Sequence, residues 1–146
     1  MQAAANVIPA VCVYVDHSDM HSRLTLASLK QHGVELQTIS VKEYPATAEA
    51  AGVTTTPCVM VQAHGANFQW VGYRPDLAAL LSDFIADGPV PAHGLTDSDQ
   101  AEAAVLTLAQ VEKFIASHHV FPDEFYAENG KNPLYRGSTV LAWLGY

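Results

Sequence analysis

The sequence predicts an α/β protein in which a four-stranded mixed sheet with flanking helices is followed by a small C-terminal α+β module. Apolar β-branched runs alternate with helical patterns in the first part of the chain. Two glycines and two prolines then interrupt the apolar pattern at 87–94, which indicates a linker. With 49% hydrophobic residues, the 146-residue chain can bury one core before this linker and another after it. We expect domains at 1–86 and 95–146.

The first domain should follow the order strand, helix, strand, helix, strand, strand, helix. Residues 7–15 form a mostly apolar run typical of a buried strand, and residues 19–32 suit a helix that Gly33 would end. The remaining elements are strands at 34–41, 58–62 and 68–71, a short helix at 46–51, a hairpin loop at 64–67 and a helix that begins at Pro75-Asp76. Leu77, Leu80, Leu81 and Phe84 give that last helix an apolar face. This order predicts a mixed sheet with a terminal hairpin.

Three local motifs give this domain a recognisable pattern. Thr56-Pro57 precedes the third strand, the heptapeptide WVGYRPD occupies 70–76, and LKQHG ends the first helix at 29–33. With the element order, they resemble NrdH-type glutaredoxin-like redoxins, which have the thioredoxin fold, over about residues 6–86. Members of that family are small dithiol reductants that supply electrons to ribonucleotide reductase.

The resemblance also implies a partner-binding surface. The family has a cis-proline at the position of Pro57, and the backbone at Thr56 would pair with an extended peptide of a partner. Tyr73, Arg74 and Asp76 fall in the family's partner-facing loop. A structural role for Arg74 and Asp76, as a turn ion pair and the N-cap of the last helix, stays open beside this one.

The catalytic motif is where the sequence departs from the family. The family places Cys-x-x-Cys at the start of the first helix, and the aligned positions here hold Asp19-Met20-His21-Ser22. A carboxylate cannot form a mixed disulfide and a serine hydroxyl cannot resolve one. We therefore expect Asp19 and Ser22 to cap the helix, with no catalytic dithiol and no cofactor.

The chain has 2 cysteines, and neither stands at those positions. Cys12 lies in the first predicted strand and should be a small packed side chain. Cys58 follows Pro57, which leaves open a residual single-thiol oxidoreductase. No lysine or arginine stands beside Cys58 in the sequence to stabilise a thiolate.

A metal site is a weaker alternative near the start of the first helix. His17 and His21 are four residues apart, with Asp19 between them. Because a strand-to-helix turn should fall within this stretch, the imidazoles need not share a face. We expect a solvated capping turn and no metal.

The tail from Leu95 should contain two short helices, a hairpin and a closing helix. Capping-box patterns occur at 96–99 and 107–110, and Leu108, Val111 and Ile115 have helical spacing. Asn129-Gly130 predicts the turn of a hairpin over 123–136, and Ser138 should open the last helix. The pattern resembles the wing and closing helix of excisionase-like and MerR-like winged helix-turn-helix modules.

Charge argues against transferring DNA binding along with that resemblance. The chain has 7 basic and 15 acidic residues, for a net charge of -8. From Leu95 onward its only basic residues are Lys113, Lys131 and Arg136, against seven acidic ones. Phosphate contacts require clustered lysine and arginine side chains. We therefore treat a DNA-binding regulator that uses the tail as an alternative, and prefer another function.

Our main prediction is a non-catalytic protein-binding or architectural protein on a degenerate redoxin fold, which binds a protein partner or a second copy of itself. The combination of small domains suggests a phage-encoded protein of the host cytoplasm or the virion. We expect no membrane association, because the longest apolar run, at 7–15, is less than half of the roughly 20 residues that span a bilayer. The residues before it lack the positive flank of a signal peptide.

Overall fold

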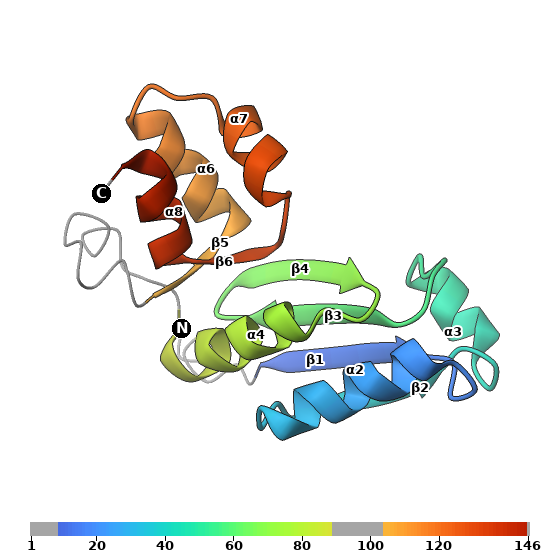
Figure 1. Cartoon of the computed structure of the whole chain (residues 1–146). Coiled ribbons are helices and arrows are strands. Elements are labelled where there is room, and N and C mark those ends of the chain that lie inside the picture. Colours follow the sequence, from blue (N-terminus) through green and yellow to red (C-terminus); the bar gives the residue numbers. More distant parts are fainter. Residues whose placement is uncertain (1–8, 89–103, 146) are drawn as a thin grey trace, which may run out of the picture. The chain divides into compact units, whose positions relative to one another are not determined.

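The computed structural model describes residues 9–88 and 104–145 (Figure 1). The chain divides into two compact units, Met1–Ile85 and Ala86–Tyr146, which we call unit 1 and unit 2. Asp87 is still helical, and positions 89–94 of the predicted linker lie outside the described residues, as do the first predicted helix of the tail and the capping pattern at 96–99. Among the described helices, none is long and apolar enough to cross a membrane.

Unit 1 contains a four-stranded mixed sheet with the strand order β2-β1-β3-β4. Its strands are β1 (Ala10–Val15), β2 (Gln37–Ser40), β3 (Cys58–Ala63) and β4 (Ala66–Val71). Strand β1 is parallel to β2 and antiparallel to β3, and β3 is antiparallel to β4. The predicted fold class is therefore confirmed: a mixed sheet whose parallel pair is joined by a helix and whose last two strands form a hairpin.

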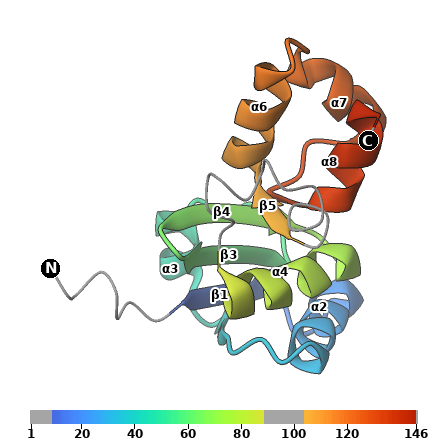
Figure 2. The ribbon, with the colours of Figure 1, turned by 90° about the vertical axis from the view of Figure 1, so that its left-hand side faces the viewer.

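Three helices flank this sheet: α2 (Met20–Gln31), α3 (Pro45–Ala50) and α4 (Pro75–Asp87). The two views in Figures 1 and 2 place α2 and α4 on one face and α3 on the other. The core on the α2/α4 face is mostly aliphatic and includes one fully buried ring, Phe84 of α4; its fully buried aliphatic members are Val13, Val15, Val59, Leu29, Leu77 and Leu81. On the opposite face Ala48 of α3 packs with Tyr14 and Cys58. This face has the smaller core because α3 has only 6 residues.

Two local predictions in unit 1 need correction. The second strand is limited to Gln37–Ser40, shorter than the predicted 34–41. The hairpin between β3 and β4 turns on two residues, His64 and Gly65, with φ angles of +51° and +80°, in place of the predicted four-residue loop. Positive φ at both central residues is the signature of a tight hairpin turn that matches strand twist.

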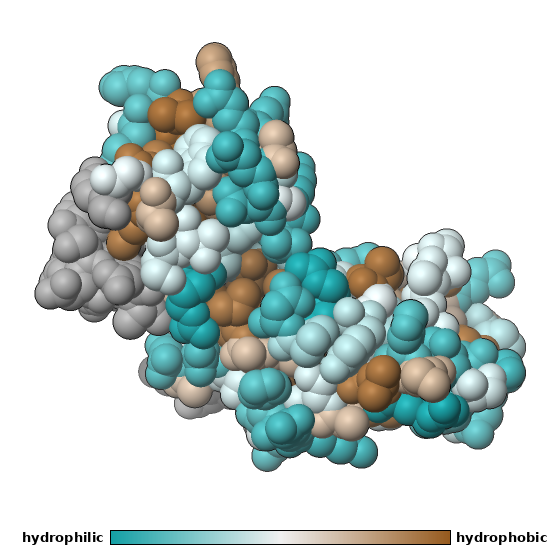
Figure 3. Space-filling view, viewed as in Figure 1, coloured by the Kyte–Doolittle hydropathy of each residue, from teal (hydrophilic) through white to brown (hydrophobic). Residues whose placement is uncertain are grey.

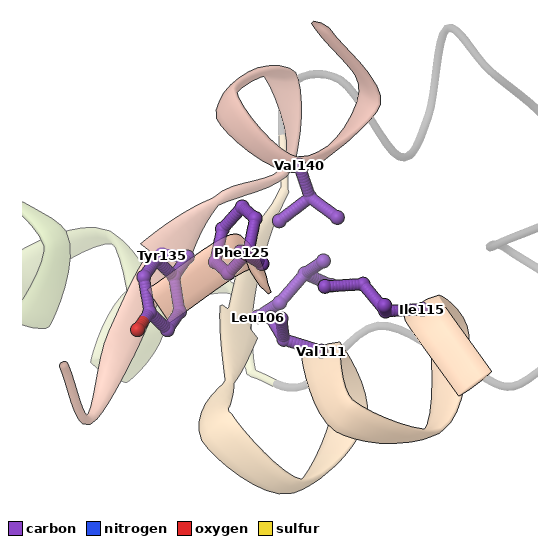
Figure 4. Close-up of a cluster of buried hydrophobic side chains, with 6 residues drawn as sticks. All are labelled: Leu106, Val111, Ile115, Phe125, Tyr135 and Val140. Carbon is purple, nitrogen blue, oxygen red and sulfur yellow. The ribbon is translucent and has the colours of Figure 1, made fainter. Parts of the chain in front are cut away.

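Unit 2 has the order β5 (Val105–Thr107), α6 (Leu108–Ser117), α7 (Pro122–Asn129), β6 (Leu134–Arg136) and α8 (Gly137–Leu144). Strands β5 and β6 form an antiparallel pair. The core shown in Figure 4 collects side chains from all five elements: Leu106, Val111, Ile115, Phe125, Tyr135 and Val140. The capping box predicted at 107–110 is confirmed, with Thr107 as the N-cap of α6 and Gln110 completing the reciprocal hydrogen bonds.

The predicted hairpin at 123–136 is wrong, because its first half is helix α7. Pro122 stands at the first position of α7, Asp123 and Glu124 occupy its first turn, and Gly130 ends it with a φ of +79°. Proline at the first position and acidic residues in the first turn are both helix-start signals. The Asn129-Gly130 pair is therefore a helix end, and β6 pairs with β5 across the unit.

Candidate functional site

The strand register gathers four loops of unit 1 at one end of the sheet. Val15 pairs with Ser40, Tyr14 with Cys58, and Cys58 with Val71. The loops at 16–19, 41–44, 54–57 and 72–74 therefore leave the sheet at the same end (Figure 1). We call this region, together with the first turn of α2 that continues from it, the cis-proline end, because the Thr56–Pro57 peptide is cis.

At the cis-proline end, the two residues that the resemblance aligns with a dithiol, Asp19 and Ser22, form structural hydrogen bonds. Asp19 is the N-cap of α2, and its Oδ2 accepts a bond of 3.2 Å from the backbone N–H of Ser22. Ser22 is fully buried, and its Oγ accepts a 3.1 Å bond from the backbone N–H of Asp16. The predicted cap by Asp19 is confirmed, whereas Ser22 ties the preceding loop to the helix and is not itself the cap.

A small polar network joins the loop after β1 to the loop after β2. Asp16 Oδ1 accepts bonds from the Ser18 backbone N–H and hydroxyl at 3.0 and 2.6 Å, and lies 3.4 Å from Lys42 Nζ. The Ser18 hydroxyl bond, more than the Lys42 charge, lowers the pKa of Asp16. These groups order the turn that precedes α2.

The residues that the resemblance assigned to partner binding divide between buried and exposed positions. Pro57 is buried, and its carbonyl oxygen accepts a 2.9 Å bond from the Gly72 N–H, which fixes the 72–74 loop beside the cis peptide. Tyr73 is 37% exposed. Arg74 forms a two-point ion pair with Asp76 at 3.0 and 2.8 Å, and this hydrogen-bonded arginine lowers the pKa of Asp76. The predicted ion pair is confirmed.

Asp76 does not cap the last helix, in contrast to the other structural role considered for it. Helix α4 begins at Pro75, so Asp76 lies within the first turn. A carboxylate there still interacts favourably with the positive end of the helix.

Large apolar side chains are exposed around the same end of the sheet. Met20 in the first turn of α2 is 62% exposed, Tyr44 before α3 is 56% exposed, and Val71 at the end of β4 is 50% exposed. Figure 3 shows hydrophobic patches set among polar residues on the visible face of unit 1. Sequence reasoning included Tyr73 in this surface but missed these three. An apolar Met20 between polar neighbours was the available signal.

The two thiols lie on the neighbouring strands β1 and β3. Cys58 is 2% exposed, and Cys12 is partly buried and packs against the same cluster, as expected for it. Both contribute to the small core under α3. Burial raises the pKa of both thiols, so the thiolate fraction at neutral pH falls below that of a free cysteine.

The weak metal candidates do not come together. Within residues 9–88 and 104–145, no group of three or more His, Cys, Asp or Glu side chains is arranged to hold a metal ion. Asp19 serves as the helix cap, and the His17 carbonyl accepts a 3.1 Å bond from Arg23.

Unit 2 has a different surface. Its one large apolar side chain with high exposure in the described residues is Phe121, at 77%. Helix α7 has acidic residues at Asp123, Glu124 and Glu128 and no basic residue. Two of the acidic side chains of this unit are bonded to aromatic ones: Glu112 to the Tyr126 hydroxyl at 2.6 Å, and Glu128 to the Trp143 indole N–H.

Comparison with known proteins finds similarity in solved structures alone, since no family model and no curated protein matches the chain. Chloroplastic thioredoxin z is 15% identical, with 60% of this chain and 86% of that chain covered and a TM-score of 0.49. NrdH-redoxin from Escherichia coli is 24% identical, covering 56% and 99% with a TM-score of 0.41. Mitochondrial thioredoxin 3 from Saccharomyces cerevisiae is 17% identical, covering 59% and 84% with a TM-score of 0.44. The strand order and pairing of unit 1, with a cis-proline before β3, define the class of the fold as thioredoxin-like.

Proposed function

We propose that this chain is a non-catalytic protein-binding protein whose contact surface is the cis-proline end of unit 1. The observation that carries the proposal is the use of Asp19 and Ser22 as structural hydrogen-bonding groups at the start of α2. In a dithiol redoxin that helix start holds the reacting thiols. Here Asp19 caps the helix in place of a reacting thiol, and the exposed apolar side chains around the start of α2 are available for contact.

The occupant that suits this surface is a protein segment with an apolar side chain. Met20, Tyr44 and Tyr73 are exposed, and methionine and tyrosine are side chains that gain contact area at interfaces. The resemblance to redoxins adds an expectation that the partner segment is extended and pairs with the backbone at Thr56.

Single-thiol chemistry at Cys58 is the weaker candidate. The side chain is almost completely buried, and burial raises its pKa. A nucleophilic thiol needs both access and a stabilised thiolate. Reduction of a disulfide substrate by the wild-type chain, lost in a Cys58→Ser variant, would replace our proposal with this one.

DNA binding by unit 2 also receives little support from its charges. Helix α7 has three acidic residues and no basic one, so it would repel a phosphate backbone. We therefore assign unit 2 an architectural role. A mobility shift of DNA at low salt would contradict this assignment, because even a weak phosphate binder retards DNA under those conditions.

Affinity capture with matched variants tests the proposed surface. The wild-type chain and a Met20→Ser/Tyr73→Ser variant are used as baits in native lysate, and bound proteins are quantified by mass spectrometry. The control is Phe121→Ser, which removes an even more exposed apolar side chain from unit 2. We expect the double variant to capture at least about tenfold less of one bound protein, because side chains that anchor an interface carry much of its binding energy. The control should capture that protein as the wild type does.

Equal capture by all three baits would contradict the proposal. A partner lost only with Phe121→Ser would transfer the binding surface to unit 2. Circular dichroism of each variant checks that the loss is not unfolding, which is not expected because these side chains are exposed.

A further inference from the structure

The outer edge of β4 is an open hydrogen-bonding edge. Strand β4 ends the order β2-β1-β3-β4, and no other strand pairs with its far side in the described part of the chain. The pairing of β3 and β4 runs one to one from Cys58↔Val71 to Ala63↔Ala66 with no bulge. A continuous unpaired strand edge is a template for another strand.

The direction of the backbone groups follows from the register. The Gly72 N–H donates to Pro57 O, and residues alternate along an antiparallel strand between bonding inward and bonding outward. Trp70 and Phe68 therefore bond to β3, while Asn67, Gln69 and Val71 direct their N–H and C=O groups to the open edge. All three of these residues are exposed.

Edge strands in natural proteins are normally protected by charge, proline or shortness. The other edge of this sheet is protected: β2 has 4 residues and is flanked by Glu35 and Lys42. Strand β4 has 6 residues, and no charged residue and no proline occurs between Ala63 and Tyr73. The protective features of the β2 edge are therefore absent from the β4 edge.

We propose that β4 pairs with β4 of a second copy of this chain, antiparallel and across a two-fold axis at Gln69. In this register Gln69 lies opposite Gln69, and Asn67 lies opposite Val71. Each copy then satisfies all the outward N–H and C=O groups of its three residues. The two four-stranded sheets become one continuous sheet.

The side chains in this register are mutually compatible. On one face the two Gln69 carboxamides meet at the axis, where they can bond to each other without like-charge repulsion. On the other face Phe68 of each copy lies opposite Trp70 of the other copy in a non-hydrogen-bonded pair. Within its own copy Trp70 is buried and Phe68 contacts the ring of Phe84, so this pair extends an existing aromatic cluster. Aromatic cross-strand pairs are among the favourable ones. This complementarity of the strand to itself favours a second copy over an unrelated partner strand.

The net charge predicts how the pairing responds to salt. Each copy has a formal charge of -8, while the paired strands are uncharged. Repulsion between the copies acts over a distance that salt shortens, to about 8 Å at physiological ionic strength. Dimerisation should therefore strengthen as salt is raised.

Sedimentation equilibrium of the full chain tests the proposal with a matched pair of variants. Gln69→Lys places two like charges at the axis, whereas Gln62→Lys makes the same charge change at an exposed position of the adjacent inner strand. We expect a reversible dimer in the wild type and in Gln62→Lys, weakened about fivefold in Gln69→Lys. An equimolar mixture of Gln69→Lys and Gln69→Glu should restore dimerisation, because opposite charges then meet at the axis.

Gln69→Pro gives a second, stronger test. The backbone N–H of Gln69 faces outward, so a proline at this position removes a bond to the second copy without removing a bond to β3. We expect at least tenfold weaker dimerisation, about the effect of two lost hydrogen bonds.

A wild-type chain that stays monomeric up to about 1 mM, the weak end of the affinity scale, overturns the proposal. So does a dimer that is equally weakened by Gln62→Lys and Gln69→Lys. Neither outcome depends on the partner-binding function proposed above, because these variants leave Met20 and Tyr73 unchanged.

Discussion

The two units hold their cores together in different ways. Unit 1 buries many aliphatic side chains between a sheet and two helices, and its fully buried ring, Phe84, lies among them. Unit 2 has a two-stranded pair and three short helices, and its interior is centred on the ring of Phe125. This ring makes edge-to-face contacts with Tyr126, Tyr135 and Trp143 at centroid distances of 6.1, 5.1 and 5.3 Å. We therefore expect unit 2, which lacks layered sheet packing, to depend strongly on Phe125.

Removing that residue should have the largest effect. We expect Phe125→Ala to destabilise unit 2 by about 3–5 kcal/mol, because truncation of a buried aromatic side chain leaves a cavity. Denaturant titration followed by amide NMR signals of each unit measures the loss separately. Signals from β5 to α8 should be lost at lower denaturant, while those of β1 to β4 keep their wild-type midpoint. An equal loss of stability in both units would contradict the interpretation that Phe125 holds unit 2 together.

A single hydroxyl group should have the next largest effect. The Tyr135 hydroxyl donates to Gly130 O at 2.5 Å and accepts from the Asn132 N–H at 2.6 Å, which fixes the chain between α7 and β6. Tyr135→Phe removes both bonds while keeping the ring against Phe125. We expect a loss of about 1–3 kcal/mol in urea titration, the cost of unmet buried polar groups. A loss as large as that of Phe125→Ala would show that the loop, and not the ring, holds unit 2 together.

A side-chain cap starts a helix in each unit. Asp19 starts α2 in unit 1 and Thr107 starts α6 in unit 2. Asp19→Ala and Thr107→Ala should each cost about 0.5–2 kcal/mol in thermal or urea unfolding. We expect the effect of each substitution to stay within its own unit when followed by amide NMR. The interpretation of Asp19 as a cap would be wrong if its substitution left stability unchanged.

The smallest expected effect is a change in the stability contribution of Tyr126, and it is confined to alkaline pH. Burial first, and then the bond to Glu112, raises the pKa of Tyr126 well above its ordinary value of 10.0. A raised pKa means that the folded state holds the proton more tightly than the unfolded state, so this contribution is complete below pH 10 and is lost as pH rises further. The stability difference between the wild type and Tyr126→Phe should be constant from pH 7 to about 9.5 and shrink above 10. A constant difference up to about pH 11 would contradict the assigned shift.

Short-range signals accounted for most of the correct predictions. Hydrophobic periodicity identified the order of the elements in unit 1, and the Thr107–Gln110 pattern identified the start of α6. The predicted hairpin at 123–136 is wrong because Asn-Gly is also a common helix end, and because Pro122 at the first position of α7 starts a helix. For the candidate site, sequence pointed to Thr56, Pro57 and Tyr73 but not to the exposure of Met20, Tyr44 and Val71.

The sequence by itself determined which residues are absent from the first turn of α2, because an aspartate and a serine cannot exchange disulfides wherever they lie. It also determined the charge and the uncharged stretch around β4. Only the tertiary structure decided that Ser22 is buried against the loop at Asp16, that Cys58 is inaccessible, and that β4 is an edge strand. Burial and strand neighbours depend on contacts between residues far apart in the chain, and no local pattern records them.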